Sequence, residues 1–434
     1  MRYPSSSPTR RWDPPTTGCV VPDLLLWAMR MVSMLFTPLR IGPVTVRNRI
    51  AKSAMAEGRC DADGRPLPSL VRLYERWAQG GVGLCMTGMA HVRRGYSFTG
   101  QEIGLYDDSL IAPLREVTES VHRHESRIFA QICWAPPQLP RSKARALGAT
   151  APSAGFNKTN LLFDRSLTDR EIEDIVMDFG EAARRAREAG FDGVQLHGAH
   201  GYLISRMLSP KHNRRSDRWG GDFERRLAFA RAIFGATRRA VGADYPVMVK
   251  LNVHDGEPGG MDVDTGVRIA QSMAGWGVDA IEVSAGTGDV GFGCYPNKGG
   301  IPLASGKQYV HKNFPALKML GPLVDVTLGA VGRRVGFPGE AYFEPLARRV
   351  AEAVSIPVLC VGGIRSLAVA ERIVRDTPIA MISLGRPLVR EPELPNRWRD
   401  GTTSVAACTS CNECFTHIGL GFPLSCRAPE SVST

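Results

Sequence analysis

The stretch TDREIEDIVMDFGEAARRAREAGFDGVQLHGAHGY, residues 168–202, holds one complete helix-to-strand unit whose pattern recurs along the chain. In its first part apolar residues recur at i, i+3, i+4 and i+7, which predicts an amphipathic helix over 169–189. Thr168 can cap this helix together with Glu171, and Gly190 stands where a helix ends. The apolar run 193–197 that follows predicts a strand buried on both faces.

The same alternation of short apolar runs and helix-period segments continues from residue 49 onward. The predicted strands span residues 49–55, 83–88, 128–133, 193–197, 247–252, 280–285, 358–362 and 379–385. Buried strands that alternate with helices in this number predict an α/β protein of the (β/α)8 TIM barrel type. A doubly wound open sheet is the alternative, but no strand-to-helix turn carries the G-x-G-x-x-G fingerprint of dinucleotide binding.

The composition is typical of a soluble globular protein. Of the 434 residues, 43% are hydrophobic and 22% are charged. No apolar run is long enough for a membrane-spanning helix and nothing resembles a secretory signal, so we expect a cytoplasmic protein without membrane association. The formal net charge of +11 is scattered in short clusters, which argues against a nucleic-acid surface.

The ends of the chain differ from the predicted barrel, which we place at residues 34–400. Residues 1–33 are rich in Pro and Ser, and we expect a disordered extension. There are two alternatives for this part. It could be a weak targeting segment, or its start codon could be assigned too early, with Met34 as the natural first residue. Residues 401–434 form a cysteine-rich extension.

Three chemically active side chains follow the strand at 193–197. His197, His200 and Tyr202 lie within six residues, at a place where parallel α/β proteins bind ligands. A core histidine with a local hydrogen bond is the simpler explanation for any one of them, but three together favour a site. The barrel rule places further site residues at or just beyond other strand ends. These are Ser53, Met55, Gln131 and Lys250.

Glycine turns follow the last two predicted strands. Gly362 and Gly363 come after the seventh strand, and Gly385 with Arg386 after the eighth. In TIM barrels these two loops commonly bind phosphate through backbone N–H groups. The pattern therefore predicts a phosphate-bearing ligand.

Several of these motifs together resemble the old yellow enzyme family of FMN-dependent NADH:flavin oxidoreductases. They are NRIAKSAM (48–55), Gln131, HGAHGYL (197–203), SPKHNRRSDRWGG (209–221) and LGR (384–386). The chain is most similar to the FMN barrel of the 2,4-dienoyl-CoA reductase and trimethylamine dehydrogenase branch, over residues 35–430. Trp219 stands where that family usually has Tyr, and Trp134 where it often has His.

The resemblance implies a role for each residue. The backbone at Ser53, Ala54 and Met55 packs against the flavin, Gln131 hydrogen-bonds its pyrimidine end, and Lys250 is the cation near N1. Gly363, Gly385 and Arg386 hold the phosphate, with Gly362 in the same turn. His197 and His200 bind the carbonyl of an unsaturated substrate, and Tyr202 donates the proton. The implied reaction moves hydride from NAD(P)H through flavin to an activated alkene, or runs a related dehydrogenation.

The cysteines at 408, 411, 414 and 426 form the sharpest metal pattern in the chain. Four thiolates at short spacing suit a 4Fe–4S cluster or a structural zinc ion. In the related branch a similar cluster relays electrons to a second domain. The chain ends soon after Cys426, so a working cluster would need a separate electron-transfer partner. An iron–sulfur centre, a structural metal site and a relic with free thiols all stay open.

Two other functions compete with the flavoenzyme hypothesis. A metal-dependent hydrolase could use His197 and His200 as ligands, with Asp192, His254 or Asp255 completing the set. A non-catalytic binder of a phosphate-bearing ligand could use the same barrel. We further expect a small-molecule substrate, a homo-oligomer, and an active-site lid over residues 286–339, which are rich in Gly and Pro.

Overall fold

The computed structural model describes residues 33–97, 99–136, 139–158, 160–287, 308 and 339–427. Within them, eight parallel strands close into a barrel in the spatial order β10-β11-β12-β13-β3-β4-β5-β9. They are β3 (Ile50–Lys52), β4 (Leu84–His91), β5 (Arg127–Cys133), β9 (Gly193–Gly198), β10 (Val247–Asn252), β11 (Ala280–Ser284), β12 (Val358–Val361) and β13 (Met381–Leu384). Because every one of these strands has a neighbour on both sides, the (β/α)8 prediction is confirmed and the open sheet is wrong.

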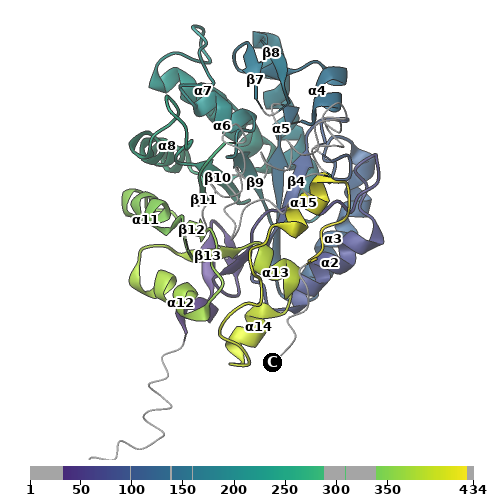
Figure 1. Ribbon diagram of the computed structural model, residues 1–434, viewed down its shortest axis with the longest axis vertical. Helices are drawn as coiled ribbons and strands as arrows, with labels where there is room; N and C mark the ends of the chain where they lie inside the picture. Colours follow the sequence, from purple (N-terminus) through teal and green to yellow (C-terminus); the bar gives the residue numbers. More distant parts are fainter. Residues whose placement is uncertain are drawn as a thin grey trace, which may run out of the picture. The chain divides into compact units, whose positions relative to one another are not determined.

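Helices connect the strands and surround the barrel, as Figure 1 shows. They are α2 (Pro68–Gln79), α3 (Ile111–His122), α5 (Asp169–Glu188), α7 (Phe223–Val241), α8 (Val263–Trp276), α11 (Glu344–Ala353), α12 (Leu367–Asp376) and α13 (Arg386–Arg390). The helix predicted over 169–189 is α5, and its capping box is present. The Thr168 hydroxyl accepts from Glu171 N at 3.2 Å, while Glu171 Oε2 accepts from Thr168 N at 2.8 Å. The cap satisfies backbone donors that would otherwise be unpaired in the first turn.

Shorter elements complete the described part of the chain. They are η1 (Met34–Phe36), β1 (Leu39–Ile41), β2 (Val44–Val46), η2 (Asp108–Leu110), α4 (Arg141–Leu147), β6 (Thr150–Ala151), β7 (Gly155–Asn157), β8 (Leu162–Ser166), α6 (Leu203–Leu208), α14 (Leu394–Arg399) and α15 (Glu413–Gly419). No described helix is long and apolar enough to cross a bilayer. The expected extension at 1–33, except Ser33, and nearly all of the expected lid at 286–339 lie outside the described residues.

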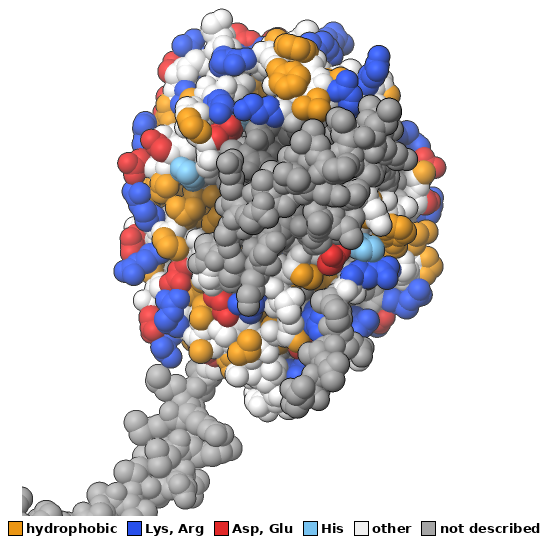
Figure 2. Space-filling view, viewed as in Figure 1, with side chains coloured by type: hydrophobic (Ala, Val, Ile, Leu, Met, Phe, Trp, Pro, Cys, Tyr) orange, Lys and Arg blue, Asp and Glu red, His pale blue; other side chains and the backbone are white. Residues whose placement is uncertain are grey.

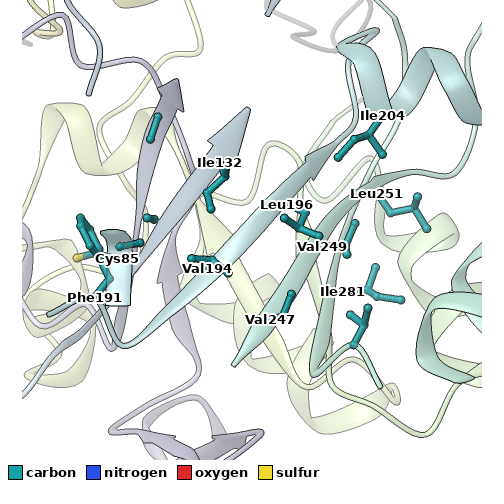
Figure 3. Packing of buried hydrophobic residues seen from close by; sticks show 14 of the residues in the cluster. Cys85, Ile132, Phe191, Val194, Leu196, Ile204, Val247, Val249, Leu251 and Ile281 are labelled. Atoms are coloured by element: carbon teal, nitrogen blue, oxygen red, sulfur yellow. The ribbon is translucent and has the colours of Figure 1, made fainter. Parts of the chain in front are cut away.

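Two hydrophobic cores hold the barrel together. The larger one fills the space between strands and helices, where Figure 3 shows Val194, Leu196, Val247 and Val249 among its members. A smaller one lies inside the barrel and contains side chains from the strands together with Ile41 and Val46 of the β1–β2 hairpin. Its strand members are Ala51, Leu84, Met86, Phe129, Met248, Ala280, Leu359 and Met381. The hairpin therefore closes one end of the barrel.

The strand alternation determines which residues face the barrel interior. On β10, Val247, Val249 and Leu251 belong to the outer core, whereas Met248 belongs to the inner one. Because successive strand side chains point to opposite faces, Lys250 shares the inward face with Met248. The polar residues of these apolar strands therefore lie in one layer inside the barrel, next to the inner core and nearer the C-terminal ends of the strands.

Surface charge is mixed rather than gathered in one stripe. On the face seen in Figure 2, Lys and Arg side chains are interspersed with Asp and Glu. Elsewhere in the described structure, charges also pair along single helices, as Arg348 does with Glu352 on α11 at 2.8 Å. The view therefore gives no support for a continuous cationic track on that face.

Candidate active site

The turn after β9 brings His197, His200 and Tyr202 together. The His197 ring centroid lies 5.2 Å from that of His200 and 4.6 Å from that of Tyr202. His200 has a left-handed backbone with φ 62°, followed by Gly201 with φ 78°. This sparsely populated conformation turns the chain sharply at the strand end. The His200 Nε2 atom lies 2.7 Å from Ser284 Oγ, which ties the turn to the end of β11.

Both imidazoles are held in the neutral form. Burial, together with the nearby charge of Lys250, lowers the pKa of His200 to about 3. Burial, His200 and Lys250 likewise lower the pKa of His197 well below its ordinary value. The Nδ1 atom of His197 is buried and has no hydrogen-bond partner in the described structure. A neutral imidazole keeps one N–H donor, so this pair can donate to a ligand oxygen.

A polar layer lies inside the barrel next to this turn. Lys250 and Glu282 are register partners on β10 and β11, and Lys250 Nζ lies 3.0 Å from Glu282 Oε1. Ser53, which follows β3, donates its hydroxyl to Glu282 Oε1 at 2.8 Å and accepts from Lys250 Nζ at 3.1 Å. Ser383 of β13 also donates to Glu282 Oε1, at 2.8 Å. The predicted residues Ser53 and Lys250 therefore meet around a carboxylate.

The same layer continues to Gln131 through a second glutamine. Gln131 Nε2 on β5 donates to Gln195 Oε1 on β9 at 2.7 Å, and Gln195 Nε2 donates to Glu282 Oε2 at 2.9 Å. Burial would raise the pKa of the Glu282 carboxyl, but the charge of Lys250 and the donated hydrogen bonds together hold it below its usual value. The layer is thus an ionised, fully buried network.

The segment after β3 is anchored from behind by a second buried ion pair. Lys52 Nζ lies 3.0 Å from Glu57 Oε1, and Tyr74 donates its hydroxyl to the same carboxylate oxygen. Ala54 and Met55, between these two charged residues, are half-buried. A Cβ added at Gly385 would lie 3.3 Å from Met55 Sδ, so the glycine at the end of β13 allows the two loops to approach. The predicted residues Met55 and Gly385 are therefore neighbours.

The glycine turn after β12 has a backbone that other residues rarely adopt. Gly362 and Gly363 have φ 126° and 73°. A Cβ at Gly363 would lie 2.7 Å from the Tyr342 ring, in a backbone conformation already unfavourable for L side chains. Both the space and the conformation at this turn therefore require glycine.

Arg386 extends from the end of β13 toward the cysteine-rich segment. Its Nη1 donates to Asn412 Oδ1 and, at 3.4 Å, to Ser410 O. It also lines a cavity with Arg390 and with the four predicted cysteines. These are Cys408, Cys411, Cys414 and Cys426. Its predicted contact with a phosphate stays a prediction.

The four cysteines line one cavity. Burial raises the pKa of the Cys414 thiol to about 12 and also raises that of Cys408. Within the described ranges, no group of three or more His, Cys, Asp and Glu side chains is arranged to hold a metal ion. The C-terminal segment nevertheless packs on the loop after β3, since Leu424 N donates to Glu57 O at 2.8 Å.

The sequence reasoning missed Glu282, Gln195, Ser383 and Ser284. The available signal was a charged residue, Glu282, inside a strand that is otherwise apolar and buried on both faces.

The hydrolase hypothesis is not supported, because the carboxylates that it needs as metal ligands are engaged in other contacts. Asp192 precedes β9 and pairs with His122 at 2.7 Å and Arg127 at 3.1 Å. Asp255 accepts hydrogen bonds from Ser209 and from the Met261 backbone, at 2.7 Å each.

Known proteins resemble the chain over most of its length. The sequence pattern of the NADH:flavin oxidoreductase / NADH oxidase family matches residues 34–287. An NADH oxidase from Thermoanaerobacter brockii is 34% identical over 384 residues, covering 87% of this chain and 52% of that enzyme. A 4,4'-dithiodibutanoate disulfide reductase from Rhodococcus erythropolis is 30% identical over 390 residues, covering 89% of this chain and 93% of that protein.

A solved structure shares the fold. The old yellow enzyme homologue from Zymomonas mobilis superposes with a TM-score of 0.67 at 22% identity, covering 87% of this chain and 95% of the other. The chain spans about half the length of the Thermoanaerobacter enzyme (52%) and nearly the whole length of the Zymomonas protein. The barrel is therefore the part common to these proteins.

Proposed function

Because the chain belongs to the NADH:flavin oxidoreductase / NADH oxidase family, we propose that it is an FMN-dependent oxidoreductase. It takes hydride from NADH or NADPH and delivers it to the β-carbon of an alkene activated by a carbonyl group. The observation that carries the proposal is the convergence of a buried polar layer with two neutral histidines and a tyrosine at one end of the barrel. The family gives no support for the hydrolase alternative.

The side chains present fit FMN. Gln131 donates from its Nε2 atom to Gln195 Oε1. Its carbonyl oxygen is therefore turned away from Gln195, where it can accept from a ring N–H. Lys250 supplies a fixed cation. The glycine turns at 362–363 and 385 follow β12 and β13, the two strand ends where TIM barrels commonly bind a phosphate through backbone N–H groups. FMN would supply the hydride-transfer chemistry that no amino-acid side chain provides.

The residues of the turn after β9 bind the substrate carbonyl group and donate the proton. His197 and His200 are neutral, so each can direct an N–H toward the substrate carbonyl oxygen and stabilise negative charge as it develops there. Tyr202 lies against His197 and is half-buried, so it can deliver a proton to the α-carbon. The family resemblance implies that phenols bind beside the flavin and give a charge-transfer absorption band. In the double variant His197→Ala/His200→Ala we expect bound flavin but no such band, because the donors to the phenol oxygen are lost. Retained phenol affinity would remove the pair from this role.

An anaerobic titration tests the proposed activity. NADH or NADPH should bleach the visible absorption of the purified flavoprotein, and a cyclic enone added afterwards should restore it. Failure of both nucleotides to reduce the flavin would contradict the nicotinamide half of the proposal. Reduction by nucleotide without reoxidation by any enone would contradict the alkene half.

We further propose that the four cysteines bind a 4Fe–4S cluster. Support comes from their shared cavity and from the arginines beside them, because Arg386, Arg390 and Arg427 also line it. Metal binding requires thiolates, and burial keeps the Cys414 thiol protonated in the metal-free protein. Cluster binding would therefore release protons.

Iron analysis of anaerobic preparations tests the cluster. The wild-type protein should contain about four irons per chain, the stoichiometry of a 4Fe–4S cluster held by four cysteine thiolates, and Cys411→Ser should lose them. Thr409→Ala is the matched control, since Thr409 lines the same cavity without a thiol. Zinc in place of iron would favour a structural site, and protein with full flavin but neither metal would show free thiols.

A further inference from the structure

Glu282 is a buried carboxylate to which the proposed chemistry gives no role. It is 0% exposed and lies at the centre of the polar layer. It accepts from Ser53 and Ser383 at 2.8 Å each, from Gln195 at 2.9 Å, and lies 3.0 Å from Lys250 Nζ. These four donors come from four other barrel strands or strand ends.

The carboxylate determines how two amides are oriented. An ionised carboxylate can only accept hydrogen bonds, so Gln195 must turn its NH2 group toward Glu282 and its carbonyl oxygen toward Gln131. Gln131 must then turn its own NH2 group toward Gln195. The Gln131 carbonyl oxygen is left as the acceptor that faces away from this chain of hydrogen bonds. Glu282 therefore determines, through Gln195, that Gln131 presents its carbonyl oxygen and not its NH2 group to a ligand.

The same carboxylate offsets the positive charge of its neighbour in the layer. Lys250 Nζ contacts Glu282 and Ser53, and the exposed fractions of the Lys250 and Glu282 side chains are 4% and 0%. At such burial two opposite charges interact much more strongly than in water. A ligand above the layer therefore meets an ion pair in place of an isolated ammonium group.

We propose that Glu282 is a positioning residue of the flavin site, which fixes the edge that Gln131 presents and offsets the charge of Lys250, and thereby sets the reduction potential of the bound flavin. The inference rests on the proposed function, since it requires FMN to bind in this barrel. Without Glu282, Lys250 would stabilise the negative charge of the reduced flavin more strongly. A residue that only strengthened the barrel would change stability without changing the potential.

Two variants separate the charge from the amide orientation. Glu282→Gln removes the negative charge but keeps a carbonyl oxygen that can accept from Gln195. Its flavin potential should rise by about 30 mV or more, a tenfold change in the equilibrium constant of a two-electron couple. Gln195→Met keeps the ion pair but breaks the connection to Gln131, and it should weaken FMN binding by about tenfold, the effect of one lost hydrogen bond. Ser383→Ala is the control, since it removes one hydrogen bond but neither the charge nor the connection.

The potentials are measured by anaerobic dye equilibration on holoproteins with FMN at full occupancy. A Glu282→Gln potential equal to that of the wild type would overturn the charge role, and unchanged FMN affinity in Gln195→Met would overturn the orientation role. If Glu282→Gln fails to fold, the FMN affinity of Gln195→Met still tests the orientation role. Glu282→Asp, which retains the charge, should then fold and keep the wild-type potential. Failure of the wild-type protein to bind FMN would instead count against the proposed function.

Discussion

Lys250 and Glu282 are direct register partners on neighbouring barrel strands, and their charged groups lie 3.0 Å apart inside the barrel. The pair connects the fold to the site, because the strand alternation that packs Val249 outward turns Lys250 inward. A buried ion pair is costly to break from one side, since the remaining charge has no water to solvate it.

Lys250→Met should therefore reduce the free energy of unfolding by about 3–5 kcal/mol, the usual cost of removing one partner of a buried pair. Urea-induced unfolding measures the loss. Arg348→Met is the control, because its pair with Glu352 on α11 is exposed and is worth about 0.3–0.5 kcal/mol. Similar losses in the two variants would show that the interior pair carries no special stability.

The neutral histidines predict a stability that falls on acidification. The pKa of His200 is lowered to about 3, and that of His197 is lowered well below the ordinary value of 6.5. Below pH 6.5 the unfolded chain takes up two protons that the folded protein excludes, so stability is present above that pH and is lost as the pH falls. The slope from the pair approaches about 2.7 kcal/mol per pH unit. Unfolding titrations between pH 7 and 5 should show a much smaller slope in His197→Asn/His200→Asn. An unchanged slope would mean that other groups cause the loss.

Tyr202→Phe should separate the two half-reactions. The ring contact with His197 survives the change, so flavin reduction by NAD(P)H should stay close to wild type. Alkene reduction should slow by roughly 10²–10⁴-fold, the usual contribution of a positioned proton donor. Stopped-flow absorbance resolves both steps. Equal slowing of the two steps would assign Tyr202 a structural role only.

Gly363→Ala should weaken FMN binding and stability together. The left-handed backbone, φ 73°, costs an alanine about 1–2 kcal/mol, and the added Cβ would meet the Tyr342 ring at 2.7 Å. Gly275→Ala is the matched control, because it lies in α8 with no atom within 4 Å of the added Cβ. That change should stabilise the helix by about 0.5–1 kcal/mol. Thermal unfolding and FMN titration of the two variants test these expectations. Unchanged stability and FMN affinity in Gly363→Ala would show that the turn can relax.

Much of the barrel could be predicted from the sequence because each buried strand is a short apolar run between periodic helices. Strand ends were less certain. β3 ends at Lys52, since Ser53 and the residues after it leave the ladder to form the site, while β4 extends to His91. Local propensity does not report where a strand stops pairing with its neighbours.

The partners of the site residues could not be predicted, because they depend on barrel closure. Glu282 meets Ser53 across 229 positions of sequence and Gln195 across 87. Arg386 shows the same limitation. Its position after β13 predicts a phosphate contact, whereas its described hydrogen bonds go to Ser410 and Asn412 in the C-terminal segment. Only the folded path of that segment brings these groups together.

The cofactor itself gives the most direct test of the proposed function. The purified protein is heated to release its chromophore, which is then identified and quantified by chromatography and mass spectrometry. We expect FMN, equimolar with the chain. Release of FAD, or failure to bind any flavin after reconstitution with FMN, would contradict the proposed FMN site and with it the hydride transfer proposed for this protein.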